Sequence, residues 1–142
     1  MSIKRYASAQ WSGDLKGGKG TISSKSGALT NQPFGFNTRF EDKKGTNPEE
    51  LIGAAHAGCF AMAFANELSS LDVVPKDVST KATVHLEEID GGFKITRSDI
   101  DVTLDAPGAD RSDIDKALKA AEAGCPVSNA LNAEVKVTLT VK

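Results

Sequence analysis

One segment constrains the fold more than any other, because it predicts a long helix without a polar face. The Asn47 side chain suits a helix N-cap, and Pro48 suits the first helical position. Glu50 completes an Asn-x-x-Glu capping box, and Glu49 and Glu50 both meet the positive end of the helix dipole. From Leu51 the sequence LIGAAHAGCFAMAFANEL is small or apolar on nearly every side. Such a helix is central, packed against several elements or against a second subunit.

The other segments predict strands and shorter helices around this central helix. Extended segments are expected at residues 3–13, 21–24, 34–40, 80–87, 93–104 and 134–141, and helices at residues 110–123 and 126–131. Glycine-rich turns, KGGKG and DGG, separate two of the strand pairs. The order β-β-β-α-β-β-α-α-β is typical of an α+β fold with mostly antiparallel sheets packed on one central helix. The chain, residues 1–142, is expected to form a single domain.

Composition and charge exclude several classes of function. Hydrophobic residues make up 39% and charged residues 25% of the chain, so global disorder is not expected. The formal net charge is −2 and the lysines are scattered singly, which argues against a nucleic-acid partner. The first residues, MSIKRYASAQW, lack the apolar run of a signal peptide, and polar residues interrupt the apolar segment 51–68. We therefore expect a cytoplasmic protein that does not associate with membranes.

The chain has two cysteines in different settings. Cys59 lies midway along the central helix in HAGCF, and Cys125 lies at a helix junction in AGCPV. In a reducing compartment such a pair is seldom a permanent bridge, so the alternatives are a redox pair or two unrelated buried thiols. Gly58 precedes Cys59, and it indicates either close approach of another backbone or a substrate, or tight helix packing.

A reactive Cys59 would need a nearby cation. The thiolate is the nucleophile, and at an ordinary pKa near 8.5 only about 3% of a cysteine is ionised at pH 7. Burial lowers that fraction, and the helix dipole fades within the first turn. Arg39, flanked by aromatic residues in FNTRF, is the best candidate for a buried cation, and Glu49 is the nearest carboxylate to orient it. Alternatively, Arg39 is an exposed strand residue and Glu49 an ordinary helix-cap carboxylate.

His56 lies three residues before Cys59, on the same side of the predicted helix. It could orient or deprotonate the thiol, or form a metal-binding pair with it. One histidine and one cysteine do not complete a zinc site, which needs three or four ligands. We therefore interpret His56 as a core histidine with its polar atoms paired.

The sequence resembles a known family over nearly its whole length. The segment GTNPEELIGAAHAGCFAMA closely resembles the central helix of the OsmC family, osmotically inducible proteins related to organic hydroperoxide resistance proteins. The N-terminal segment WSGDLKGGKGTISSKSGALTNQPFGFNTRF and the later AEAGCPVSNAL resemble its OsmC branch. Both cysteines stand at positions similar to those of the family.

The resemblance implies an intertwined homodimer with two active sites at the subunit interface. It also implies thiol-dependent reduction of peroxides, preferably organic hydroperoxides, without a metal or organic cofactor. By position, Cys59 resembles the peroxidatic cysteine, Cys125 the resolving cysteine and Glu49 the carboxylate that pairs with the activating arginine. The first hairpin loop, KGGKG, lacks the arginine that the hydroperoxide-resistance branch carries there, so Arg39 resembles the solution of the OsmC branch.

These roles define a catalytic cycle and its alternatives. Cys59 would attack the peroxide and become a sulfenic acid, and Cys125 would condense with it to a disulfide. An external dithiol, lipoyl or thioredoxin-like, would then reduce the disulfide. We expect an apolar substrate pocket from a set of nearby side chains: Phe34, Phe36, Phe60 and Met62. The alternatives are a dimer that binds a small apolar ligand and a redox sensor without meaningful turnover.

The spacing along the central helix favours a site shared between subunits. Ten residues separate Glu49 from Cys59, which corresponds to about 15 Å along a helix axis. Neither a glutamate nor an arginine side chain spans that distance. Two antiparallel copies of the helix would bring Glu49 of one subunit toward Cys59 of the other, and Arg39 could come from either subunit.

Overall fold

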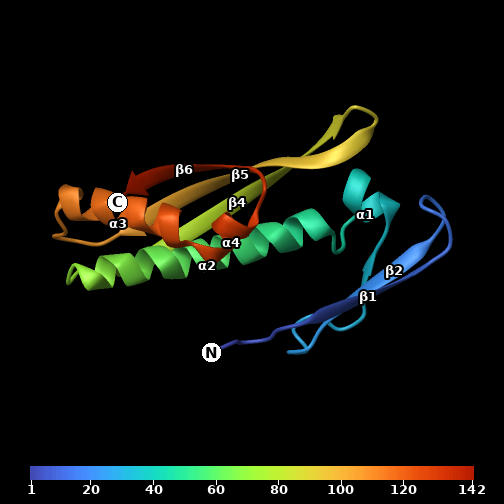
Figure 1. Ribbon diagram of the computed structural model, residues 1–142, viewed down its shortest axis with the longest axis horizontal. Helices are drawn as coiled ribbons and strands as arrows, with labels where there is room; N and C mark the ends of the chain where they lie inside the picture. Colours follow the sequence, from blue (N-terminus) through green and yellow to red (C-terminus); the bar gives the residue numbers. More distant parts are fainter. The chain divides into compact units, whose positions relative to one another are not determined.

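The computed structural model of the protein describes all 142 residues and contains two compact units, residues 1–51 and residues 52–142 (Figure 1). In chain order the elements are β1 (Ala7–Ser12), β2 (Lys19–Ser24), β3 (Gln32–Phe34), α1 (Phe36–Phe40), α2 (Pro48–Ser70), β4 (Asp77–Ile89), β5 (Gly92–Asp105), α3 (Arg111–Gly124), α4 (Pro126–Ala130) and β6 (Glu134–Val141). Two three-stranded sheets and four helices confirm the predicted α+β class. The observed order differs from the expected one by one additional helix, α1.

Helix α1 replaces a segment that we expected to be extended, and this prediction was wrong. Aromatic residues and threonine in FGFNTRF favour strands by propensity. The backbone instead turns at Gly35, where the Thr38 hydroxyl accepts from the Gly35 N–H (2.9 Å) and donates to the Gly35 carbonyl oxygen (3.1 Å). The Arg39 N–H also donates to the Gly35 carbonyl oxygen, at 3.2 Å. These local hydrogen bonds outweigh strand propensity.

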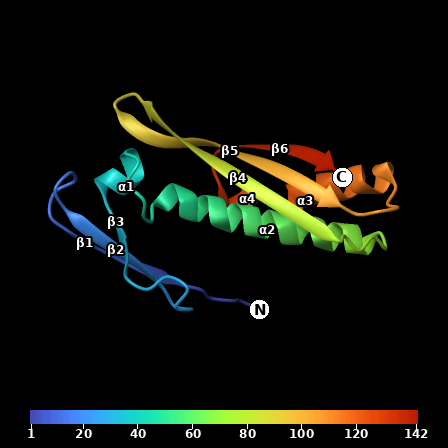
Figure 2. The same cartoon turned by 180° about the vertical axis from the view of Figure 1, so that it is seen from behind.

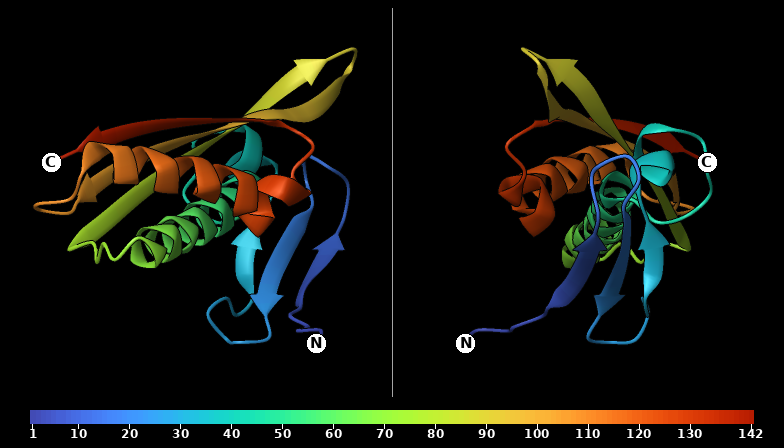
Figure 3. Two further views of the ribbon diagram at one scale, coloured as in Figure 1. Left: turned by 60° about the vertical axis from the view of Figure 1, so that its left-hand side comes forward. Right: turned by 90° about the vertical axis from the view of Figure 1, so that its right-hand side faces the viewer.

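The sheet of the first unit has the order β1-β2-β3, with antiparallel neighbours (Figure 3). Gly20 pairs with Trp11 on one side and with Phe34 on the other. The two rings lie with centroids 5.5 Å apart. A Cβ atom at Gly20 would meet both rings at less than 3 Å, so glycine is required for this aromatic contact.

The beginning of α2 follows the predicted capping pattern in most respects. The Glu50 N–H donates to Asn47 Oδ1 at 2.8 Å, and the Leu51 N–H donates to the Asn47 carbonyl oxygen at 3.2 Å. The Glu50 carboxylate accepts a hydrogen bond from the Asn47 side-chain amide. That amide also donates to the Thr38 carbonyl oxygen at 3.2 Å, which ties the start of α2 to α1.

The sheet of the second unit has the order β4-β5-β6 (Figure 2). Strands β4 and β5 form a long antiparallel hairpin that turns at Asp90 and Gly91 and carries one irregularity between His85 and Leu86. Strand β6 pairs in parallel with β5, in register from Arg97–Glu134 to Leu104–Val141. A parallel pair needs a long crossover connection, and α3 and α4 supply it.

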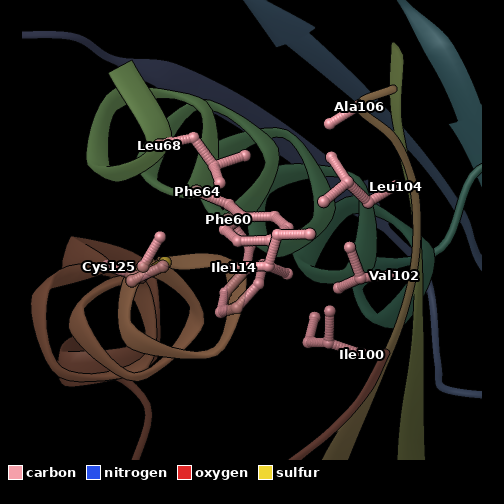
Figure 4. Packing of buried hydrophobic residues seen from close by; sticks show 11 residues of the cluster. Phe60, Phe64, Leu68, Ile100, Val102, Leu104, Ala106, Ile114 and Cys125 are labelled. Atoms are coloured by element: carbon pink, nitrogen blue, oxygen red, sulfur yellow. The ribbon is translucent and has the colours of Figure 1, made fainter. Parts of the chain in front are cut away.

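The core of the second unit lies where α2 and α3 pack on one face of its sheet (Figures 1 and 4). Its principal members are Phe60, Phe64 and Leu68 of α2, Ile100, Val102 and Leu104 of β5, and Ile114, Ala117 and Ala121 of α3. The spacings of four residues on the helix and of two on the strand place each set on one side of its element. Gly53 marks a close approach of α2 to β4, since a Cβ atom there would lie 3.2 Å from the Ala82 carbonyl oxygen.

The opposite side of α2 is small and apolar, and the other elements of the second unit do not cover it. Ala54, Ala55 and Gly58 are exposed, and Met62 is 77% exposed. No atom outside the helix lies within 4 Å of a Cβ built on Gly58. Neither a closely approaching backbone nor tight helix packing is therefore observed at this glycine. By length and composition α2 could cross a membrane, a test that core helices of soluble proteins also pass.

Candidate active site

The two cysteine sulfurs lie 3.4 Å apart, and both thiols are free. Cys59 is partly buried on α2. Cys125 is fully buried at the junction of α3 and α4 (Figure 4). The Cys125 N–H donates to the Ala121 carbonyl oxygen, and its own carbonyl oxygen accepts from the Asn129 N–H, so Cys125 ends one helix and begins the next. A disulfide bond measures about 2.05 Å, so a movement of roughly 1.4 Å would join the sulfurs.

The two thiols differ in acidity. Burial raises the pKa of Cys59, and the neighbouring Cys125 thiol raises it further against the opposing effect of the Val127 backbone N–H. Burial also works against ionisation of Cys125, but the Ser128 hydroxyl and the backbone N–H groups of Ser128 and Val127 hold the pKa of Cys125 below its ordinary value. Within residues 52–142 none of these influences on Cys59 is a cation. A reactive Cys59 thiolate therefore requires a positive charge from elsewhere.

The first unit contains a guanidinium held by a carboxylate. Arg39 Nη2 lies 2.8 Å from Glu49 Oε1, and Arg39 Nε lies 3.0 Å and 3.3 Å from the two Glu49 oxygens. The Glu49 side chain is only 11% exposed and that of Arg39 is 37% exposed. Bidentate pairing fixes the plane of the guanidinium and leaves Nη1 out of this contact. The expected Arg39–Glu49 contact is present, and the role of either residue in catalysis stays a prediction.

An apolar pocket of about 300 Å³ adjoins Arg39 within the first unit. Its lining consists of Trp11, Leu15, Phe34, Gly35, Phe36, Arg39 and Phe40. Two of the four side chains expected in a substrate pocket, Phe34 and Phe36, line it. The expectation was wrong for Phe60, which is 0% exposed in the core of the second unit, and Met62 projects outward. Phe60 was misassigned because a helix with apolar residues all round does not reveal which side faces the sheet.

His56 is a fully buried histidine with both ring nitrogens paired. Its Nδ1 lies 2.8 Å from Ser98 Oγ, and its Nε2 lies 2.6 Å from Ser128 Oγ. Burial lowers the pKa of His56, which favours the neutral imidazole. The interpretation as a core histidine with paired polar atoms is confirmed. Sequence reasoning missed both serines, because they lie 42 and 72 residues from His56 and stand in no recognisable motif.

The protein has two thiols within contact distance, and an arginine that a carboxylate orients beside an apolar pocket. These are the chemical groups of a dithiol redox protein. Comparison with known families narrows this class. Residues 41–140 match the family described as OsmC-like protein, and the chain belongs to that family.

Individual relatives cover most or all of the chain. Peroxiredoxin OsmC of Escherichia coli (strain K12) is 49% identical over 142 residues, which are 100% of this chain and 99% of that protein. Organic hydroperoxide resistance protein OhrB of Bacillus subtilis (strain 168) is 30% identical over 129 residues, or 89% of this chain and 93% of that protein. The crystal structure of Bacillus subtilis OhrB superimposes with a TM-score of 0.70 at 28% identity, over 96% of this chain and 98% of that chain.

Proposed function

We propose that the protein is a thiol-dependent peroxidase that reduces organic hydroperoxides, and hydrogen peroxide less well. The observation that carries this proposal is the 3.4 Å separation of Cys59 Sγ and Cys125 Sγ, because a sulfenic acid at one sulfur would meet its resolving thiol without a large rearrangement. The names of the relatives, a peroxiredoxin and an organic hydroperoxide resistance protein, support the same activity.

The proposed cycle uses only the side chains of the protein and an external reductant. The Cys59 thiolate attacks the terminal oxygen of the peroxide ROOH, the O–O bond breaks, and Cys59 becomes a sulfenic acid. The leaving RO⁻ takes from water the proton that Cys59 lost on ionisation, and departs as ROH. Cys125 then attacks Cys59, which forms the disulfide and releases water. An external dithiol, lipoyl or thioredoxin-like, returns both cysteines to thiols by exchange. No step requires a metal or an organic cofactor.

The activating charge is proposed to come from a second subunit. Cys59 has a raised pKa and no cation acting on it within residues 52–142. Glu49 stands ten residues before it on the continuous helix α2, about 15 Å along the axis. In a homodimer that pairs the exposed apolar side of α2, the Arg39–Glu49 pair of one subunit would serve Cys59 of the other. The 142 residues would then act as one domain in a cytoplasmic dimer.

Arg39 and the pocket beside it would set the preference for substrate. The Nη1 group, which the Glu49 contact does not use, can donate to a peroxide oxygen, and the aromatic wall can accept an alkyl or aryl group. Burial of a few methylene groups at about 0.8 kcal/mol each gives a ten- to hundredfold preference over hydrogen peroxide.

Steady-state peroxide consumption tests the proposal. With excess dihydrolipoamide or dithiothreitol, the protein should reduce cumene hydroperoxide continuously, with a catalytic efficiency at least about tenfold above that for hydrogen peroxide. Cys59→Ser should abolish turnover, while Arg97→Lys, an arginine in a separate ion pair, serves as the control. Oxidation that stops after one equivalent, despite excess dithiol, would indicate a sensor or an incidental thiol pair instead of a peroxidase.

A further inference from the structure

His56 is a buried titratable residue that the proposed peroxidase cycle does not use. Its two partners come from different elements, since Ser98 lies on β5 and Ser128 lies on α4. A buried imidazole needs a partner at each nitrogen, and backbone groups or a water would serve that purpose equally well. In this structure one partner stands in the same helical turn as the resolving cysteine.

Ser128 connects His56 to the thiol pair. Cys125 is the N-cap of α4, and its carbonyl oxygen accepts from the Asn129 N–H at 3.1 Å, so Ser128 falls in the first turn that follows. The Ser128 hydroxyl and its backbone N–H both lower the pKa of Cys125, whose side chain lies at the start of the same helix. Cys125 in turn contacts Cys59. Hydrogen bonds therefore link Ser98, His56 and Ser128, and Ser128 lies in the first helical turn after Cys125, whose sulfur is 3.4 Å from that of Cys59.

We propose that His56 and Ser128 are positioning residues for the resolving step, in which the Ser128 hydroxyl, oriented by His56, holds Cys125 as the nucleophile toward Cys59. This inference rests on the proposed peroxidase function. It assigns His56 a role in disulfide formation and not in the attack on peroxide.

The hydrogen bonds around Ser128 depend on which groups donate a proton. When Nε2 of His56 carries the proton, it donates to Ser128 Oγ, and the single Ser128 proton remains for the Cys125 thiolate. Ser98 then donates to Nδ1. In the other tautomer Ser128 donates to Nε2 and accepts from the Cys125 S–H. The neutral imidazole can thus satisfy either ionisation state of Cys125 without leaving a buried polar atom unpaired.

The step itself is balanced without any further reagent. The Cys125 sulfur attacks the sulfur of the Cys59 sulfenic acid, the S–S bond forms, and the S–O bond breaks. The thiol sulfur is oxidised and the sulfenic sulfur is reduced. The hydroxide displaced from Cys59 combines with the proton that Cys125 released on ionisation, and they leave as water.

Transient kinetics with one equivalent of cumene hydroperoxide test this role. Ser128→Ala should form the sulfenic acid at the parent rate but form the disulfide about tenfold more slowly or worse, because a hydrogen bond to a charged group is lost. Ser128→Thr, which keeps the hydroxyl, should restore the disulfide rate. Dimedone added at successive times measures the sulfenic acid, and thiol counting measures the disulfide. His56→Gln should reproduce the selective slowing of the second phase.

Each outcome either supports or overturns the proposal. Disulfide formation at the parent rate in Ser128→Ala or in His56→Gln overturns it. Equal slowing of both phases, or failure of Ser128→Thr to restore the rate, indicates general structural damage and also contradicts a positioning role.

A second measurement separates this inference from the proposed function. In a Cys59→Ser background Cys125 is the one remaining cysteine, so thiolate absorbance in the ultraviolet follows its ionisation alone. Adding Ser128→Ala should raise the pKa of Cys125, and adding Ser128→Thr should not. If the parent protein does not consume peroxide, the proposed function fails while this titration still reports the contact. If the parent turns over and the titration curves coincide, the inference alone fails.

Discussion

At the scale of single residues, the planar shape of the Arg39 guanidinium is as important for its contacts as its charge. Its Nε and Nη2 groups bind the nearly buried Glu49 carboxylate, which leaves the Nη1 edge of the same rigid plane for a ligand. A lysine has one ammonium group on a flexible stem and cannot make both contacts in a fixed geometry. The guanidinium plane therefore matters for the proposed chemistry.

Arg39→Lys should slow the first turnover with cumene hydroperoxide by about ten- to hundredfold, the equivalent of one charged hydrogen bond. Glu49→Gln should have a smaller effect in the same direction, because the charge of Arg39 remains while its orientation loosens. Stopped-flow measurement of the first oxidation step gives both rates. A parent-like rate in Arg39→Lys would show that this arginine does not activate Cys59.

His56 makes the stability of the fold depend on pH in a defined direction. Burial lowers the pKa of folded His56 below its ordinary value near 6.5, so the unfolded chain binds more protons in that window. The contribution of a neutral His56 is complete above the unfolded pKa and is lost as the pH falls toward the folded pKa. A difference of one bound proton between the folded and unfolded states changes the free energy of unfolding by at most about 1.4 kcal/mol per pH unit.

The free energy of unfolding in urea should therefore fall between about pH 7 and pH 5, and His56→Gln should reduce that slope. The comparison between variant and parent isolates His56 from other groups that titrate in the same range. If the free energy of unfolding falls with pH equally in both proteins, a buried neutral His56 is not the cause of that pH dependence.

At the scale of elements, sequence patterns predicted a helix or strand correctly where contacts between residues close in the sequence determine it. The NPEE capping pattern predicted the start of α2, and the alternation of residues 134–141 matches β6. Helix α1 escaped prediction because side-chain hydrogen bonds of Thr38 to Gly35, and not propensity, turn the backbone there. The contacts of His56 escaped prediction because folding brings together elements far apart in the chain.

Thr38→Val tests how α1 is held. The substitution keeps the shape of the buried side chain but removes both hydrogen bonds to Gly35, so it should lower the free energy of unfolding by about 1–3 kcal/mol. It should also slow the first oxidation step, since α1 carries Arg39. Thr30→Val, which loses one exposed hydrogen bond to Gly27, is the control and should change stability by less than about 0.5 kcal/mol. Equal effects of the two substitutions would contradict this account of α1.

At the scale of the whole molecule, the sequence could predict the α+β class, because that follows from the pattern of elements. The family resemblance singled out Cys59 and Cys125, whose sulfurs lie 3.4 Å apart, and their roles in catalysis stay a prediction. The expected second subunit is a property of the assembly, and the exposed surface of α2 is the observation that bears on it. A helix that is apolar all round requires more cover than one sheet provides, and the second unit leaves one side of α2 exposed. The charge that Cys59 lacks and the surface that α2 exposes have the same proposed explanation, a partner subunit.

Subunit complementation tests that explanation. Cys59→Ser and Glu49→Ala should each be inactive alone, and a mixture that exchanges subunits should recover about a quarter of the parent activity. Half of the dimers would be mixed, and each mixed dimer would hold one intact site of two. Exchange is verified independently by native mass spectrometry. No recovery despite exchange, or full activity in a monomer, would place the site within one chain.

The central claim, a peroxide-driven disulfide between Cys59 and Cys125, is tested most directly by anaerobic thiol counting before and after one equivalent of an alkyl hydroperoxide. The parent protein should lose both thiols, and a dithiol should restore them. Cys125→Ser should consume the peroxide and yield a dimedone-reactive sulfenic acid at Cys59, while Cys59→Ser should keep its remaining thiol. Two intact thiols beside unconsumed peroxide, or peroxide consumption by Cys59→Ser and not by Cys125→Ser, would contradict the account.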